Sequence, residues 1–231
     1  MFAAVAEGVV VRVIAVIFCL FLLAGPVLAG PWQREKGQWF VASGSNLFLS
    51  DGSELPVHYD PTAYVEYGLT PLVTVGLDYH TADKGRIQTG FVFASFPLID
   101  TNGRDRFAAS IGFGARADPL HPVEKLTRAG LAWGRGLDTG WLSIDASATY
   151  GTIDQVFRPK LDLTWGYNVN DRWTTSAQLQ AGEGYDDDYY AKVATSVSYG
   201  ITDTYRLSIG WVQGITGDQG GAVKVDLWAT Y

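Results

Sequence analysis

The chain is 231 residues long and acidic, with a formal net charge of −7, and it contains a single cysteine. The acidic balance argues against a nucleic-acid partner, because phosphate backbones attract basic surfaces. No segment after residue 29 has the roughly 18 consecutive apolar residues that a membrane-spanning helix needs. Any later membrane crossing must therefore use strands.

The N-terminus has the pattern of a secretory signal peptide. An uncharged apolar run covers Val13 to Gly25, and the small residue Ala29 follows shortly after a Gly-Pro break. This pattern predicts a signal over residues 1–29 that is cleaved after Ala29, with an uncleaved anchor helix as the alternative. Because the stretch before the run carries Glu7 and only one basic side chain, Arg12, we hypothesise that translation begins near residue 10 or 11.

Cleavage at this position would divide the chain into three parts. The signal would take Cys19 with it, so the mature chain would contain no thiol, which suits an oxidising periplasm. Residues 30–37 would form a short periplasmic segment, long enough for no more than a partial stopper. Residues 38–231 would form the folded domain.

The folded part alternates apolar and polar residues in segments of about ten, as transmembrane strands do. In the segment 86–96 both faces are apolar, so its register stays open. The pattern predicts an all-β fold, a transmembrane antiparallel up-and-down β-barrel of about twelve strands. Eight segments alternate clearly, at 73–80, 106–114, 142–150, 160–167, 173–181, 192–199, 205–211 and 223–231, and four less clearly, at 39–49, 63–68, 86–96 and 128–134.

Turn residues and aromatic residues place the two ends of this barrel. Five similar turns are expected on the periplasmic side, at 67–70, 100–103, 137–140, 167–170 and 199–202, and six connections outside, near Asp51, Lys84, Pro119, Asp154, Asp186 and Asp218. Twelve strands with both termini in the periplasm require this division. Aromatic residues are expected in two interfacial belts, with Tyr67, Tyr167, Trp173, Tyr199, Tyr205 and Tyr231 at the inner turns and Tyr79, Tyr150, Tyr189 and Trp211 at the outer ends.

The last strand indicates where the protein resides. Val223, Val225, Leu227, Ala229 and Tyr231 share one face, and the chain stops on the aromatic residue. This arrangement is typical of the closing strand of a Gram-negative outer-membrane barrel and resembles the signal that the barrel-assembly machinery reads. We therefore expect the outer membrane as the location, with membrane lipid and that machinery as partners.

One hairpin also resembles a known group of proteins. The stretch Ala63–Tyr79, AYVEYGLTPLVTVGLDY, is similar to small proteobacterial outer-membrane barrels, some of which are grouped with channels of phenol-degradation meta-pathways. The Tyr-Gly-Leu-Thr motif within it is turn chemistry, so the resemblance implies a fold and a channel function but transfers no site residue.

Side-chain size favours an open lumen. Barrel width rises with strand number, and about twelve strands lie between a filled interior and an open pore. Most residues expected to face inward are Gly, Ser, Thr or Ala, which favours a narrow, wet passage. The expected function is a narrow channel for small polar or mildly amphipathic solutes. A sealed barrel with a structural or adhesion role is the alternative.

Charged residues are expected on opposite sides of the lumen and mouth, with Arg86, Arg116 and Arg128 near the outer ends of consecutive strands. Facing charges could create a transverse field that selects solutes, or they could pair and brace the wall. The basic side comprises Arg86, Arg106, Arg116, Arg128 and Lys160, and the acidic side Asp78, Asp145, Asp162, Glu183, Asp186, Asp187, Asp188 and Asp226.

The sequence gives little support for catalysis or cofactor binding. His58 and His121 lie beside prolines near outer connections, and His80 ends a strand two residues after Asp78. None of them is paired with a nucleophile in the pattern of an outer-membrane lipid hydrolase. The Asp186–Asp188 run lacks the spacing and glycine of a calcium loop. We expect no enzyme activity, cofactor or metal, with an outer-membrane lipid-modifying enzyme as the second alternative.

Overall fold

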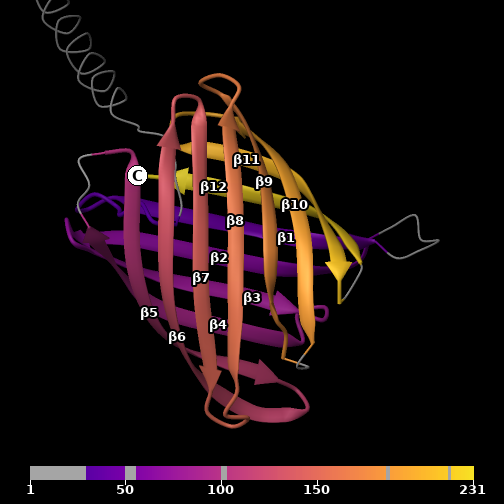
Figure 1. Ribbon diagram of the computed structural model, residues 1–231. Helices are drawn as coiled ribbons and strands as arrows, with labels where there is room; N and C mark the ends of the chain where they lie inside the picture. The colour runs from indigo at the N-terminus through magenta and orange to yellow at the C-terminus, as the bar shows by residue number, and fades with distance from the viewer. Residues whose placement is uncertain (1–29, 50–55, 100–102, 186–187, 218–219) are drawn as a thin grey trace, which may run out of the picture.

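The chain folds into a closed antiparallel barrel of twelve strands (Figure 1). The computed structural model describes residues 30–49, 56–99, 103–185, 188–217 and 220–231, so the expected signal peptide lies outside the described residues. Each strand pairs with its neighbours in sequence, and β1 closes the barrel against β12. The strands are β1 Trp39–Leu49, β2 Pro56–Thr70, β3 Val73–Ala82, β4 Ile87–Ile99, β5 Asp105–Asp118, β6 His121–Leu137, β7 Gly140–Gly151, β8 Phe157–Asn168, β9 Trp173–Glu183, β10 Tyr189–Gly200, β11 Tyr205–Thr216 and β12 Gly221–Thr230.

The expected strand number and topology are confirmed, and the differences concern strand ends. β2 and β6 are much longer than the segments 63–68 and 128–134 that alternate in sequence. Both extensions contain proline, which cannot donate to the strand ladder and therefore hides the strand pattern. At Pro97 the pairing of β4 with β5 shifts register by a bulge. No helix within the described ranges is long and apolar enough to cross a membrane.

The barrel resolves the open register of β4. Phe91 is only 3% exposed and Phe93 lines the interior, whereas Val92 is 59% exposed on the outer surface. The polar neighbours Thr89 and Ser95 are buried on the same inner face as the two phenylalanines. Two apolar faces therefore reflect an aromatic patch inside the barrel and a lipid-type surface outside it.

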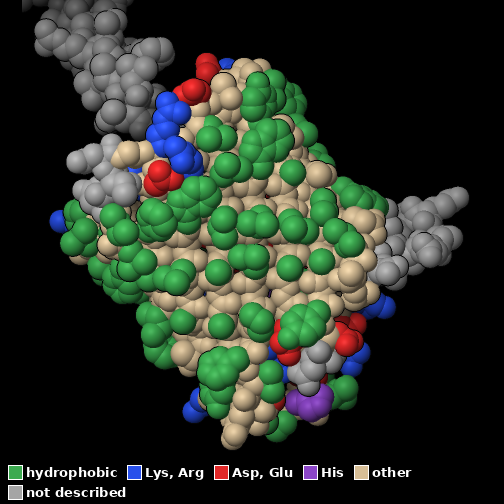
Figure 2. All heavy atoms as spheres, in the orientation of Figure 1, with side chains coloured by type: hydrophobic (Ala, Val, Ile, Leu, Met, Phe, Trp, Pro, Cys, Tyr) green, Lys and Arg blue, Asp and Glu red, His purple; other side chains and the backbone are tan. Residues whose placement is uncertain are grey.

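Apolar side chains cover the middle of the barrel face seen in Figure 2, with charged side chains gathered near its two ends. We call this outer apolar surface the apolar belt. Val92, Phe113, Leu131 and Ile209 are each more than half exposed in this belt. Aromatic rings mark both ends, as expected for a barrel whose rim lies at a membrane interface. The ring pairs are Trp39–Tyr67, Trp173–Tyr199 and Tyr205–Tyr231 at one end and Tyr150–Phe157 at the other.

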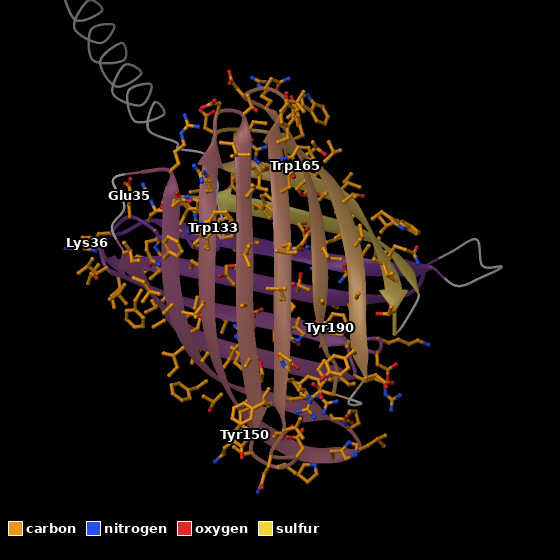
Figure 3. All side chains as sticks on the ribbon, in the orientation of Figure 1. Glu35, Lys36, Trp133, Tyr150, Trp165 and Tyr190 are labelled. Carbon is orange, nitrogen blue, oxygen red and sulfur yellow. The ribbon has the colours of Figure 1, made fainter. Side chains whose placement is uncertain are left out.

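The two ends of the barrel differ in what they contain. We call the end where β1 begins and β12 stops the terminal end; there Trp39 and Tyr231 exchange two backbone hydrogen bonds of 2.9 and 3.0 Å. Five connections lie at this end and six at the opposite end, the loop end. The inner turn expected at 67–70 belongs to β2, which continues to Thr70, and Asp51 and Asp218, expected in outer connections, lie outside the described residues. Trp133 and Trp165 lie toward the terminal end and Tyr150 and Tyr190 toward the loop end (Figure 3).

Candidate functional site

The N-terminal segment, residues 30–37, runs inside the terminal end of the barrel. Arg34 is buried and its Nε lies 2.5 Å from Glu66 Oε2 on β2. The backbone nitrogen of Arg34 donates to Thr74 Oγ1 on β3 at 3.0 Å, and its guanidinium lies over the Phe40 ring at 4.4 Å. One arginine thus ties the segment to three consecutive strands.

The earlier residues of the segment continue across the lumen. Gln33 donates to Ser95 Oγ on β4 at 2.9 Å. Pro31 is fully buried, and Pro31 and Trp32 lie so close to Gly134 on β6 that a Cβ at that glycine would approach them to 2.4–2.5 Å. Gly30 reaches Asp145 on β7. We call residues 30–36 the lumen segment, because they cross the interior from β2 to β7, which lie on nearly opposite sides of the barrel.

Small residues make room for this crossing. A Cβ at Gly68 on β2 would lie within 3 Å of the backbone of both Arg34 and Glu35. Gly37 donates to the Gly68 carbonyl at 2.8 Å, and Gln38 accepts from the Gly68 nitrogen at 2.9 Å. Gly68 and Gly134 are therefore sites where the barrel wall is shaped for the segment.

A cavity of about 470 Å³ lies in the lumen beside Gly30. One side of it is an aromatic wall contributed by Phe40 of β1, Tyr64 of β2, Phe93 of β4 and Trp228 of β12. Tyr64 stacks on Phe93 with ring centroids 5.6 Å apart, and Phe40 contacts both Tyr64 and Trp228 edge to face. These rings give the cavity an apolar surface on one side.

The opposite side is a polar wall built on β7 to β11. Hydrogen bonds order it, including Gln178 Nε2 to Thr164 Oγ1 at 3.1 Å and a 2.8 Å bond between the hydroxyls of Ser176 and Ser196. The cavity is therefore richer in aromatic rings on one side and in hydroxyl and amide groups on the other, although Glu66, Asp78 and Asp226 also line the aromatic side and Trp141 the polar side. Its polar wall includes Ser143, Asp145, Ser147, Lys160, Asp162, Thr164, Ser176, Gln178, Ser196 and Ser208.

Charges in the lumen are mostly paired rather than separated on facing sides. Arg128 Nη1 lies 2.7 Å from Asp78 Oδ2 on β3, and its guanidinium lies over Phe91 at 4.2 Å. Lys160 pairs with Asp162 at 2.5 Å on β8, and Lys224 pairs with Asp226 at 3.2 Å on β12. Most of the lumen's fixed charge is thereby neutralised locally, which favours the wall-bracing interpretation for these residues.

A cluster of charged side chains around one tyrosine covers part of the loop end. Tyr185, in the connection after β9, lies between the guanidiniums of Arg116 and Arg158, at 4.1 and 4.7 Å. Arg158 Nη2 lies 2.5 Å from Asp154 Oδ2, and Glu124 accepts from the Asp154 nitrogen at 3.3 Å. We call these five residues the mouth cluster.

The surroundings of the mouth cluster shift the pKa values of two of its members, Tyr185 and Asp154. Burial raises the pKa of the Tyr185 hydroxyl, although the two arginines oppose this effect. Burial would also raise the pKa of Asp154, but the hydrogen bonds from Arg158 and from the Val156 backbone, together with the charge of Arg158, outweigh it and hold the pKa below its ordinary value. The pair between Asp154 and Arg158 therefore stays ionised at neutral pH.

The predicted basic residues fall in three different places. Arg86 is at the loop end, exposed and paired with Asp83 at 3.2 Å, and Arg116 is in the mouth cluster. Arg128 lies deeper than expected, in the cavity, because β6 begins seven residues earlier at His121. Arg106 is at the terminal end, where it donates to the Gly103 carbonyl at 2.7 Å, and Lys160 lines the cavity.

The predicted acidic residues are divided in the same way. Asp78, Asp145, Asp162 and Asp226 line the cavity. Glu183 ends β9 at the loop end, and Asp188 is exposed there, with its carbonyl accepting from Gly184 at 2.9 Å. Asp186 and Asp187 lie outside the described residues.

The histidines show no catalytic arrangement within the described part of the chain. His80 is inside the barrel, paired in register with Thr62 and Thr89. His121 is exposed at the loop end, with Nδ1 3.4 Å from Asp118 Oδ2. The side chain of His58 lies outside the described residues.

Sequence reasoning missed the aromatic wall and the binding of the lumen segment. The alternation in β12 did place Trp228 on the inner face, but inward aromatics were not anticipated for β1, β2 and β4. The double apolar face around Phe93 was the available signal for this wall. Arg34 and Glu66 are 32 residues apart, and only the closed barrel brings them together.

Comparison with known proteins shows a shared fold. No protein-family model and no curated protein matches the chain. The KdgM porin, solved in complex with disordered oligogalacturonate, has a TM-score of 0.60 at 10% identity, covering 84% of this chain and 99% of that one. An outer-membrane channel from Pseudomonas putida F1 has a TM-score of 0.59 at 11% identity, with 87% and 97% covered. The NanC porin has a TM-score of 0.56 at 12% identity, with 84% and 98% covered.

Proposed function

We propose that this chain is an outer-membrane channel that passes small polar or mildly amphipathic solutes. The observation that carries the proposal is the cavity of about 470 Å³ in the lumen of a closed twelve-strand barrel. The fold is shared with porins and with an outer-membrane channel. The cavity is small enough to select among solutes and large enough to admit more than water.

The composition of the two cavity walls supports a small polar or mildly amphipathic solute. A solute with one apolar face could pack against Tyr64 and Phe93, while its polar groups hydrogen-bond to side chains such as Gln178 and Thr164. Because the flanking charges are largely paired, we propose weak selection by net charge and stronger selection by size and shape.

The location and partners follow from the same proposal. A signal over residues 1–29 would direct export, and the terminal end would then face the periplasm. The apolar belt would contact membrane lipid. The outward face of β12, with Leu227 45% exposed, and Tyr231 directly after the strand, 61% exposed, would present their alternating pattern to the barrel-assembly machinery.

Solute flux through proteoliposomes tests the proposal. Vesicles that contain the folded chain should swell in isotonic solutions of small polar solutes and should swell more slowly as solute size increases. Vesicles made with protein that was boiled before reconstitution provide the control. Equal swelling with folded and boiled protein would contradict the proposal.

The sealed barrel is the competing function, and two observations favour it. The lumen segment crosses the terminal end, and the mouth cluster covers part of the loop end. A sealed barrel would give no swelling with any solute. For the lipid-modifying enzyme no arrangement of described side chains offers a nucleophile with a base, and we propose that the chain is not an enzyme.

A further inference from the structure

One cavity carboxylate lacks a basic partner. Among the described residues, Glu66, Asp78, Asp162 and Asp226 each form an ion pair, whereas no ion pair involves Asp145. Its hydrogen-bond partner is Ser143 on the same strand. Asp145 also faces Asp162 in the register of β7 and β8, and Lys160 is already paired with Asp162. A partly desolvated carboxylate beside a second one is unfavourable without a nearby cation.

The backbone of Gly30 lies beside this carboxylate and lines the same cavity. A methyl group on its Cα would lie 3.2 Å from Asp145 Oδ1 and 3.4 Å from Oδ2. In a chain that begins at Gly30, a rotation of about 120° around the Cα–C bond, one staggered step, would move the amino nitrogen into that methyl position. The nitrogen would then be at ion-pair distance from both carboxylate oxygens.

We propose that Asp145 is the binding site for the protein's own α-ammonium group, created when the chain is cleaved between Ala29 and Gly30. The proposal rests on the cleavage site expected from the sequence, and it does not depend on the channel function. Before cleavage, the Gly30 nitrogen is an uncharged amide and cannot neutralise a carboxylate. After cleavage, an α-amino group with an ordinary pKa of about 7.7–8.0 is mostly protonated at neutral pH.

This pair gives the lumen segment two anchors. Arg34 holds one end to Glu66 on β2, and the α-ammonium of Gly30 holds the other to Asp145 on β7. In the processed protein the segment then has a charged contact at each end, in addition to the hydrogen bond from Gln33 to Ser95 and the packing of Pro31 and Trp32 beside Gly134. Signal removal would complete both the charge balance of the cavity and the attachment of the segment.

Reactivity of the Gly30 amine provides the test. The processed protein is purified from outer membranes, its first residue is identified, and the α-amine is labelled at pH 7 with an amine-reactive reagent in detergent. Pairing raises the amine pKa, and each unit lowers the reactive fraction about tenfold. We expect Asp145→Asn to speed labelling of Gly30 about tenfold or more, while the control Asp226→Asn, which alters a paired cavity carboxylate, changes it less than about twofold.

Two further measurements keep the test independent of effects on folding. Heat-dependent migration on a gel shows whether each variant is folded. A chain with Ser-Gly added before Gly30 keeps Asp145 but moves the ammonium away, and its terminal amine should label as fast as that of Asp145→Asn. A mature chain that begins elsewhere than Gly30, or equal labelling rates in the wild type, Asp145→Asn and the extended chain, would overturn the proposal.

Discussion

At the scale of single residues, the lumen is organised by contacts between side chains that are distant in sequence. Arg128 shows this best, because it pairs with Asp78 from three strands away and covers the ring of Phe91. The pair is about one quarter exposed, so water screens it only in part. Removing the arginine would leave Asp78 with an uncompensated charge next to the cavity.

We therefore predict that Arg128→Gln makes the channel more selective for cations. The same substitution should destabilise the barrel by about 1–3 kcal/mol, which is the typical cost of leaving a partly buried charged group without its partner. Reversal potential under a salt gradient and unfolding in denaturant measure the two effects. The control Arg86→Gln breaks an exposed pair with Asp83, which should matter by less than about 1 kcal/mol. Equal selectivity in wild type and Arg128→Gln would count against a role for Asp78 in the ion path.

At the residue scale, strand alternation in the sequence predicts which face of a strand a side chain occupies. Asp78, Asp145, Asp162 and Asp226 were expected to face inward, and they do line the cavity. Which of these four carboxylates form ion pairs could not be predicted. The ion pairs depend on the exact bounds and register of neighbouring strands, which decide the height in the lumen at which each basic side chain lies. The position of Arg128 shows this directly, since an early start of β6 moved it from the mouth to the cavity.

At the scale of elements, the lumen segment is the part of the chain with the clearest effect on the passage. It has no regular secondary structure of its own and is held by Glu66, Thr74, Ser95 and the space beside Gly134. Its length, judged from the sequence, suggested a partial stopper, but its position depends on contacts with six strands, β1 to β4, β6 and β7. Such contacts carry no periodic signal in the sequence.

We predict that a chain starting at Gly37, without the lumen segment, has a larger single-channel conductance than one starting at Gly30. The segment fills space near the terminal end, and its loss leaves that space to water and ions. Planar-bilayer recordings of the two refolded chains make the comparison. Equal conductances would show that the segment does not limit the passage.

A single substitution in the wall gives a matched test of the same element. A side chain at Gly134 would occupy the space now filled by Pro31 and Trp32. Gly134→Leu should therefore displace the lumen segment while leaving the segment's own sequence intact. We expect frequent conductance fluctuations, because the segment is no longer seated. Gly103→Leu is the control, since a Cβ there meets nothing within 4 Å, and it should behave as the wild type does.

The mouth cluster makes the corresponding prediction for the loop end. Tyr185 lies between Arg116 and Arg158, and Tyr185→Ala removes the ring that joins them. We expect faster swelling of proteoliposomes with solutes near the size limit, because the mouth becomes wider. Tyr189→Ala is the control at the same end, because Tyr189 is 70% exposed. Equal swelling of the two variants would exclude the mouth cluster as a size filter.

At the scale of the whole molecule, the alternation of each strand divides the barrel into a lipid-type outer face and a polar lumen. This division, the twelve strands and their order followed from the sequence, because strand period, turn residues and terminal aromatics all agree, although the turn expected at 67–70 belongs to β2. The cavity did not follow, because its volume depends on how side chains from β1 to β12 meet across the lumen and on the segment that enters it.

The two faces should respond differently to the same substitution. Ile144 points outward from the middle of β7, and Ser147 lines the cavity from the same strand. We predict that Ile144→Lys costs about 2–4 kcal/mol in a lipid bilayer, whereas Ser147→Lys costs much less, since a lumen lysine keeps its water. Unfolding in denaturant from lipid vesicles measures both, and equal losses would contradict the assigned faces.

Single-channel conductance of the folded chain 30–231 in a planar bilayer tests the central claim most directly. The cavity inside a closed barrel predicts discrete openings of small amplitude, with a reversal potential near zero because most lumen charges are paired. Silence from protein that still shows heat-dependent migration on a gel would contradict the channel and leave the sealed barrel as the function.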